Sequence, residues 1–403
     1  MNHDVIIIGG GPAGLSAARH LLASGVRDVV VIERNPECGG LPRFCLHRGW
    51  GALDFGRLWR GPRYARALVE AAAGATFLTN CAVTALEPDG VVRVNTPGGP
   101  RTLRARAVLL ATGIREMPRS ARLIGGTRPW GVMNTGAFQE MVRFQTLPFR
   151  APVIIGSELV AFSALETARH AGLRPVALLE ENSSLSVPAI VGAAARLRYQ
   201  VPVRTGCRLV EICGQDRVEA IIVEDNGARR RLRCDSIVLS GRFVPETALV
   251  DGRTILRDLD GTRGPVIDNF YRCTDPRIFA AGNVLRGVEH SGYVAHEGRS
   301  AAAAILRALR DDLPPSRPAI AVEGRNLRYV YPQRIVPSDG KTMLFGRSAR
   351  GAGGDLVARD ASGRELARRS VGRFAWPRLT LEIPTPDVET CDALILEREH
   401  SGQ

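Results

Sequence analysis

The sequence predicts an α/β fold built from two similar β-α-β units, followed by a small all-β domain. Three observations support this prediction. A glycine-rich turn follows an apolar run within residues 4–14, a second copy of that pattern begins 147 residues later, and short apolar runs follow a proline-rich segment at 313–318. The chain has 403 residues, of which 45% are hydrophobic and 24% charged, as is typical of a globular protein with about two to three domains.

The first β-α-β unit begins with the apolar run 5–8, which is typical of a parallel strand buried on both faces. Gly9-x-Gly11-x-x-Gly14 follows directly and leads into a helix that we expect to continue to Leu22. In such a motif Gly9 allows the tight turn, Gly11 lets a pyrophosphate approach the backbone, and Gly14 lets the helix pack on the strand. The helix N-terminus would supply N–H donors to the phosphates.

A second strand is expected over residues 29–32 and ends at Glu33, 19 residues after Gly14. An acid near this spacing binds the adenosine ribose in dinucleotide-binding proteins. A glycine turn without a ligand is the alternative. The full order of strand, glycines, helix, strand and acid favours a Rossmann-like dinucleotide-binding domain.

The second β-α-β unit is an altered copy of the first. Gly156 precedes Glu180 by 24 residues, as Gly9 precedes Glu33, but Glu158 replaces the middle glycine and Ala161 the last. A glutamate puts a side chain and a like charge where the backbone should meet pyrophosphate. We therefore expect a Rossmann-like fold that has lost its nucleotide site, and NAD binding stays open as the disfavoured alternative.

The eight cysteines include no C-x-x-C or C-x4-C pair, which argues against a redox dithiol, a zinc site and an iron–sulfur cluster. We therefore predict no metal site. The net charge is +13, but only Lys341 is a lysine and the arginines are scattered, so we expect no nucleic-acid partner. An acidic partner subunit would fit this charge.

No apolar run reaches the ~18 residues that a membrane helix needs. The dinucleotide-type sequence begins at Asp4, so we expect no signal peptide before it and a cytoplasmic protein.

Three further segments carry a family resemblance. Residues 108–113 form an apolar run that ends in Ala-Thr-Gly, residues 277–283 read Arg-Ile-Phe-Ala-Ala-Gly-Asn, and Val83 follows Asn-Cys-Ala. With these segments the chain resembles the FAD-dependent pyridine-nucleotide-disulfide oxidoreductases, in which a nicotinamide domain is inserted into an FAD domain. The resemblance implies an FAD domain over 1–118 and 243–312, an inserted NAD-type domain over 119–242, and a β domain over 313–403.

The same resemblance implies FAD as the cofactor. The residues that it places at FAD are Gly9, Gly11, Pro12, Ala13, Gly14, Glu33, Arg34, Gly40, Val83, Ala111, Thr112, Gly113, Gly282 and Asn283.

A narrower resemblance rests on residues 39–45, 115–119 and 282–289. These segments look like the FAD subunits of multi-subunit amino-acid, opine and hydroxyproline dehydrogenases and of hydrogen cyanide synthase. The resemblance implies a partner flavoprotein subunit together with a small-molecule amine substrate or electron donor. Some of those subunits carry a cysteine-rich C-terminal extension, from which this chain departs because Cys391 is its only cysteine after residue 273.

Three side chains are candidates for chemistry. Cys45 lies in the loop 38–50 with Arg43 and His47, which would favour a thiolate. An inert thiol in a loop packed beside FAD is the alternative, and we favour it. His290 precedes a helix that we expect to run to Leu309, and it would exchange a proton near the flavin. A solvent-facing cap of that helix is the alternative.

The tail after residue 318 contains five short apolar or alternating runs, and Asp360-Ala-Ser-Gly363 between two of them predicts a hairpin turn. We expect a β-sandwich that either docks a partner chain or caps the fold. The leading functional hypothesis is the FAD subunit of a dehydrogenase for an amino acid or related secondary amine, without a redox disulfide. The alternatives are a stand-alone NADH-dependent flavin reductase and a non-catalytic FAD-binding scaffold.

Overall fold

The computed structural model describes residues 2–348, 353–372, 378–385 and 393–399. The chain forms two compact lobes. The first lobe comprises Met1–Gly40, Ala67–Ile114 and Pro245–Gln403, and the second comprises Leu41–Arg66 and Arg115–Val244. The segment 41–66, which contains Cys45 and His47, therefore belongs to the second lobe.

A parallel sheet forms the centre of the first lobe, with the strand order β5-β2-β1-β8-β20. The apolar runs predicted at 5–8, 29–32 and 108–110 lie in the buried parts of β1, β2 and β8. The strands are β1 (Asn2–Ile8), β2 (Val29–Ile32), β5 (Thr76–Leu78), β8 (Gly99–Leu110) and β20 (Ile278–Ala280). The long β8 also pairs antiparallel with β7 (Val91–Thr96), which pairs with β6 (Ala82–Glu87).

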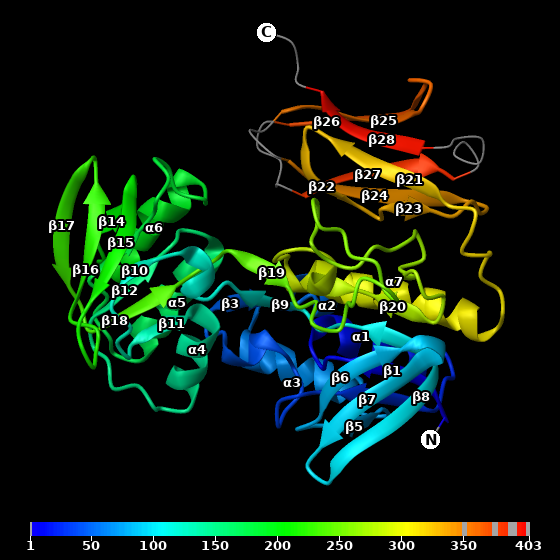
Figure 1. Cartoon of the computed structure of the whole chain (residues 1–403), viewed down its shortest axis with the longest axis horizontal. Coiled ribbons are helices and arrows are strands. Elements are labelled where there is room, and N and C mark those ends of the chain that lie inside the picture. Colours follow the sequence, from blue (N-terminus) through cyan, green and yellow to red (C-terminus); the bar gives the residue numbers. More distant parts are fainter. Residues whose placement is uncertain (1, 349–352, 373–377, 386–392, 400–403) are drawn as a thin grey trace. The chain divides into compact units, whose positions relative to one another are not determined.

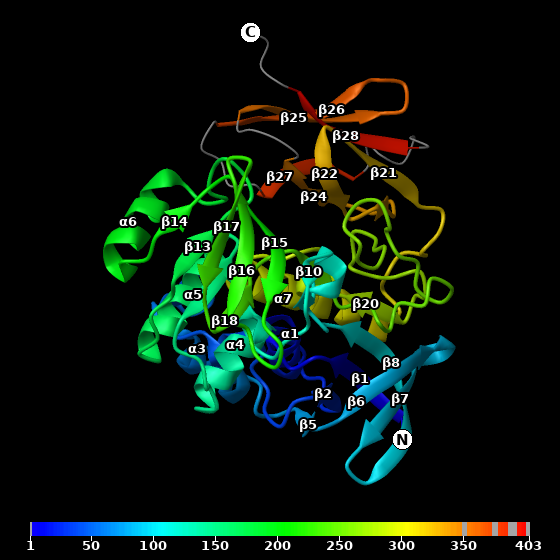
Figure 2. The same cartoon turned by 60° about the vertical axis from the view of Figure 1, so that its left-hand side comes forward.

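Two helices of this lobe, α1 (Pro12–Ala23) and α7 (Ser291–Leu309), pack side by side (Figures 1 and 2). A side chain at Gly298 would put its Cβ 2.1 Å from the Ala13 carbonyl oxygen, so the two helices can approach this closely only at a glycine. The 3₁₀ helix η4 (Gly282–Leu285) precedes α7.

The end of the chain forms two β-sheets, which lie as two layers in Figure 2. The five-stranded sheet has the order β23-β21-β28-β25-β26 and the three-stranded sheet the order β22-β24-β27. Their strands are β21 (Ile320–Arg325), β22 (Leu327–Tyr331), β23 (Arg334–Ile335), β24 (Lys341–Ser348), β25 (Gly354–Asp360), β26 (Glu365–Val371), β27 (Arg378–Pro384) and β28 (Ala393–Glu399). Their apolar side chains share one core. The predicted hairpin joins β25 to β26.

A second parallel sheet, β11-β18-β12-β13-β14, forms the centre of the second lobe. Its elements are β11 (Val132–Asn134), α4 (Thr135–Arg143), β12 (Pro152–Ile155), α5 (Leu159–His170), β13 (Ala177–Leu179), α6 (Ala189–Tyr199), β14 (Val203–Arg204) and β18 (Ser236–Leu239). A smaller sheet contains β10 (Gly125–Gly126), β15 (Cys207–Cys213), β16 (Ala220–Asp225) and β17 (Ala228–Arg233).

The segment 41–66 adds a short antiparallel pair to the second lobe. Its elements are η1 (Leu41–Phe44), β3 (Arg48–Trp50), α2 (Ala52–Phe55) and β4 (Trp59–Arg60). Helix α3 (Gly61–Ala71) leads from this segment into the first lobe, and β9 (Ile114–Glu116) pairs with β19 (Phe243–Pro245) where the chain passes between lobes.

The elements of the second β-α-β unit recur 147 residues after those of the first. Helix α5 begins 147 residues after α1, and both contain 12 residues. The strand register repeats as well, because Ile6 faces Val30 in one unit and Val153 faces Ala177 in the other. The predicted fold class, two Rossmann-like units and a C-terminal β domain, is therefore confirmed. Cys391 lies outside the described residues.

Candidate dinucleotide site

The three glycines of the first lobe's turn differ in how much space surrounds them. At Gly9, where φ is +112°, a Cβ would lie 2.3 Å from the Ala111 carbonyl oxygen, and at Gly14 a Cβ would lie 2.1 Å from the Gly9 oxygen. Gly11, which caps α1 ahead of Pro12, is different: a Cβ there would meet only the Gly40 Cα, at 3.9 Å. Gly9 and Gly14 therefore permit the turn itself, whereas the backbone at Gly11 is accessible to a ligand.

Glu33 is buried at the end of β2, and its carboxylate is held by backbone and side-chain donors. It accepts hydrogen bonds from the Gly10 N–H (3.0 Å) and from the backbone and side-chain amides of Asn35 (2.9 and 2.8 Å). These contacts fix the carboxylate beside the glycine turn. A carboxylate in this place can accept hydrogen bonds from ribose hydroxyls.

Two further segments end at the same edge of the sheet. After β8, the Ala111 N–H donates to the Ile8 oxygen at 2.9 Å, and the Thr112 hydroxyl donates to the Glu246 oxygen at 2.8 Å. After β20, Gly282 has a φ of +82°, and a Cβ on it would lie 2.8 Å from the Ala13 Cβ. The carboxyl ends of β1, β8 and β20 thus bring three separate sequence motifs together, as expected for a ligand site in a parallel sheet.

The remaining residues predicted at FAD also belong to the first lobe. Arg34 is exposed after Glu33, Val83 lies on β6 opposite Val94, and Gly113 accepts the Glu246 N–H at 2.9 Å. The Asn283 side-chain oxygen accepts the Glu289 N–H at 3.1 Å, so this amide fixes the loop before α7.

Glu158 occupies the corresponding turn of the second lobe. It caps α5 as Gly11 caps α1. Its carboxylate lies so close to the backbone that a Cβ on Gly241 would be 1.8 Å from Oε1, and one on Gly156 would be 2.8 Å from Oε2. Burial, together with the neighbouring Glu180, raises the pKa of Glu158. The Glu158 side chain thus lies in the turn where the first lobe has its open glycine, and it carries a like charge towards a pyrophosphate when ionised.

Glu180 nevertheless keeps the arrangement of Glu33. It accepts hydrogen bonds from the backbone and side-chain amides of Asn182 (2.8 and 2.7 Å) and from the Ser157 hydroxyl. The second lobe therefore retains an acid in the place of Glu33 and lacks the open glycine.

The structure does not give Cys45 the environment of a reactive thiolate. The side chain is buried, and its Sγ lies 3.5 Å from the Leu41 oxygen and 3.7 Å from the Gln139 Oε1. Burial raises its pKa to about 12, which agrees with the favoured inert thiol rather than with a thiolate promoted by Arg43 and His47. His47 is half-buried, with Nδ1 2.9 Å from the Arg48 oxygen and its ring 5.3 Å from that of Trp50. A catalytic role for Cys45 or His47 stays a prediction.

His290 is exposed and caps α7. Its Nδ1 accepts the Gly292 N–H at 3.2 Å, and its ring lies 5.9 Å from that of Tyr293. This is the capping arrangement that the sequence left as the alternative, and proton exchange at His290 stays a prediction.

Sequence reasoning missed a buried charge cluster behind this site. The Glu297 carboxylate on α7 binds both Nη atoms of Arg286 at 2.8 Å, and both side chains are buried. Arg286 Nη1 also donates to the Gly282 oxygen at 2.9 Å, and the Tyr331 hydroxyl donates to Glu297 at 3.0 Å. No spacing rule links these residues, so no local signal could have revealed the cluster.

The comparison with known proteins agrees with this geometry. Residues 3–303 match the family described as pyridine nucleotide-disulphide oxidoreductase. The chain belongs to this family. Members of this family are FAD-dependent oxidoreductases, and so is this chain. Its two dinucleotide-type folds are those of the family.

Among relatives of this oxidoreductase, an opine oxidase subunit of Agrobacterium tumefaciens (strain Ach5) is 29% identical over 342 residues, which cover 76% of this chain and 66% of the relative. Hydrogen cyanide synthase subunit HcnB of Pseudomonas protegens (strain DSM 19095 / LMG 27888 / CFBP 6595 / CHA0) is 24% identical, covering 76% and 71%. The chain spans slightly less than two thirds of the opine oxidase subunit.

Thioredoxin reductase of T. acidophilum shares the fold, with a TM-score of 0.64 at 20% identity, covering 78% of this chain and 99% of that one. In the part of this oxidoreductase that the structure describes, no helix is long and apolar enough to cross a membrane. The same residues contain no group of three or more histidine, cysteine, aspartate or glutamate side chains that could hold a metal ion.

Proposed function

We propose that this oxidoreductase is the flavin subunit of a dehydrogenase that oxidises an amino acid or a related secondary amine. The contrast between the two glycine turns carries the proposal. The turn at Gly11 is open to a dinucleotide, whereas Glu158 fills the matching turn of the second lobe. A chain that binds FAD but not a nicotinamide nucleotide needs another electron donor, and a small amine oxidised by the assembly is such a donor.

The residues of the first lobe fit FAD. The backbone at Gly11 and the N-terminus of α1 would bind the pyrophosphate, and Glu33 would hold the ribose. Gly282 and Asn283 would line the flavin side of the site, ahead of the α7 N-terminus, whose partial positive charge favours a nearby anion. FAD itself supplies the electron acceptor for amine oxidation.

The cysteines and the relatives support the same function. Seven cysteines lie in the described residues and none of them is in a disulfide. Cys45 is buried with a raised pKa, as suits a structural thiol. The opine oxidase and hydrogen cyanide synthase relatives are named as subunits, which supports a partner subunit for this chain.

A second candidate is a stand-alone NADH-dependent flavin reductase. The arrangement around Glu180 favours it, because that carboxylate is held as Glu33 is held and could bind a nicotinamide nucleotide's ribose. This candidate requires the Glu158 side chain to leave the turn.

Anaerobic titration of the natively purified protein, with whatever chains accompany it, distinguishes the candidates. The flavin absorbance is followed while NADH or one of a panel of amino acids and secondary amines is added. We expect an amine to bleach the flavin of the assembly, and NADH not to bleach the isolated chain within a few turnovers. Rapid bleaching by NADH that is lost in Glu180→Ala would establish the reductase instead. A flavin that no donor reduces would indicate a scaffold.

A further inference from the structure

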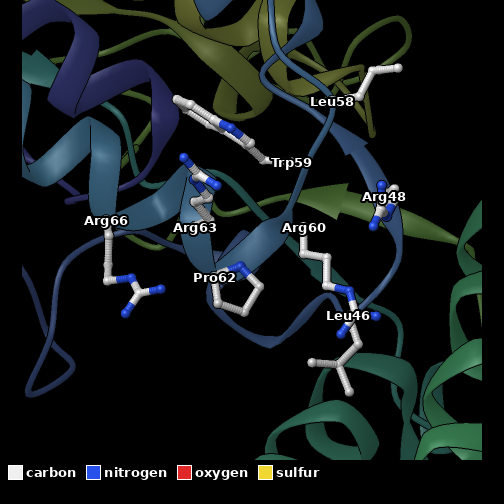
Figure 3. A pocket seen from close by; sticks show the side chains of 8 residues that line it. All are labelled: Leu46, Arg48, Leu58, Trp59, Arg60, Pro62, Arg63 and Arg66. Carbon is white, nitrogen blue, oxygen red and sulfur yellow. The ribbon is translucent and has the colours of Figure 1, made fainter.

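Four arginines gather around one pocket of the second lobe, a cavity of about 440 Å³ (Figure 3). Arg48 on β3 faces Arg60 on β4 across the antiparallel strand pair. Arg63 and Arg66 lie three residues apart on α3, which places them on one side of that helix. The wall is completed by Leu46, Leu58, Trp59 and Pro62.

The four arginines are exposed, and none of them forms an ion pair with a carboxylate among the residues that the structure describes. Arg63 lies over the Trp59 ring, with its guanidinium carbon 4.9 Å from the ring centroid. Like charges facing each other across a strand pair are destabilising, as are like charges close together on a helix. Arg48 and Arg60 are therefore like charges on paired positions, an arrangement that a bound anionic group would favour.

The same segment exposes large apolar side chains. Leu58, which lines the pocket, is 68% exposed, and Leu53 is 56% exposed. Exposed leucine and arginine side chains beside the half-buried Trp59 are characteristic of a site that docks a protein, because tryptophan and arginine are enriched where interfaces derive most of their energy.

We propose that the pocket of Arg48, Arg60, Arg63 and Arg66 docks an acidic surface of the partner subunit, with carboxylates on the guanidinium groups and an apolar side chain against Leu58 and Trp59. This proposal rests on the proposed function, which requires a partner. The chain's net charge of +13 fits an acidic partner. The concave shape of the site suits a protruding side chain better than a flat membrane surface.

The test compares two full-length double variants with equal changes in charge. Arg48→Glu with Arg63→Glu changes the pocket. Arg231→Glu with Arg233→Glu changes two exposed arginines of β17 in the same lobe, and these have no ion pair in the described residues. The partner chain is first isolated from the natively purified wild-type complex. Its affinity for each variant is then measured at low and high salt.

We expect the pocket variant to bind that chain about tenfold or more weakly and with a smaller salt dependence, while the β17 variant binds like wild type. Arg48→Glu also places opposite charges across the β3–β4 pair, so the melting temperature of the free variant should not fall. If the pocket variant with two glutamates does not fold, the affinity of the partner chain is measured with Arg48→Ala and Arg63→Ala combined instead.

Equal affinity of wild type and the pocket variant would overturn the docking site and leave the proposed function standing. An equal loss in both variants would also overturn it, because only overall charge would then matter. Wild-type protein that purifies without any second chain would overturn both the docking site and the subunit role. Co-sedimentation with phosphatidylcholine vesicles that contain phosphatidylglycerol, abolished only in the pocket variant, would assign the site to a lipid surface instead.

Discussion

Arg286 and Glu297 form a fully buried, two-pronged ion pair behind the candidate cofactor site, with both N–O distances at 2.8 Å. Arg286 lies after η4 and Glu297 on α7, so the pair joins the segment that begins at Gly282 to the helix that follows it. The Tyr331 hydroxyl brings β22 of the C-terminal β domain to the same carboxylate. Because these groups are shielded from water, each depends on its partners far more than a surface pair does.

Replacing Glu297 with glutamine should destabilise the fold. The change leaves the Arg286 charge buried without its counter-charge, which costs about 3–5 kcal/mol of unfolding free energy. Chemical denaturation followed by circular dichroism measures this. The control is Glu382→Gln, which breaks the exposed Lys341–Glu382 pair and should cost less than about 1 kcal/mol. Equal losses in the two variants would show that the buried pair has no special role.

Tyr331→Phe should cost about 1.5–3 kcal/mol, because it removes a hydrogen bond to a charged group but keeps the ring that stacks on Phe345 at 4.9 Å. Tyr329→Phe is the matched control, since the described residues give its hydroxyl no hydrogen bond. Thermal melting of both variants checks the prediction. If Tyr329→Phe were the more destabilising change, the assignment of the Tyr331 hydroxyl to Glu297 would be wrong.

Glu33→Gln should reduce the flavin content of the purified protein, because the amide carries no charge and cannot accept all the hydrogen bonds that hold the carboxylate beside the glycine turn. We expect affinity for added FAD to fall about tenfold to a hundredfold, which corresponds to one or two hydrogen bonds of a charged acceptor. Glu180→Gln, the same change in the second lobe, should retain wild-type flavin. Fluorescence titration of the apoprotein with FAD measures both.

Cys45 should react slowly with iodoacetamide. Since burial raises its pKa to about 12 from 9.0, its thiolate fraction near pH 8 should be about a thousandfold below that of an ordinary cysteine. Mass spectrometry of the labelled peptides over a range of pH measures the rate, with Cys213, which is only partly buried, as the internal reference. Fast labelling of Cys45 with a midpoint below pH 9 would restore it as a candidate nucleophile.

Glu166 should give the second lobe an acid-sensitive stability. A hydrogen bond from Arg169, with others from Tyr199 and Arg198, lowers its pKa to about 2 although burial opposes the shift. Its folded pKa lies below the unfolded value of 4.5, so its contribution is complete above that pH and is lost as the pH falls towards 2. Melting temperatures of wild type and Glu166→Gln should therefore converge between pH 4.5 and 2. A difference that stays constant would contradict the assignment.

The sequence alone determined the two β-α-β units and most of the candidate cofactor site. The signals there are local: an apolar run, a turn that only glycine permits at Gly9 and Gly14, and an acid at a fixed distance. The 147-residue repeat placed α5 in step with α1, and it identified Glu158 as the change that closes the second turn.

Tertiary structure decided which side chains are buried and with whom they pair. Arg43 and His47 lie near Cys45 in sequence and kept a thiolate as a candidate beside the favoured inert thiol, and the fold buries that thiol beside Gln139, 94 residues away. Glu297 gains its partners from the segment after η4 and from β22, and Arg48 faces Arg60 only because β3 and β4 pair in that register. Desolvation and charge pairing depend on contacts between distant segments, so residue type and spacing cannot predict them.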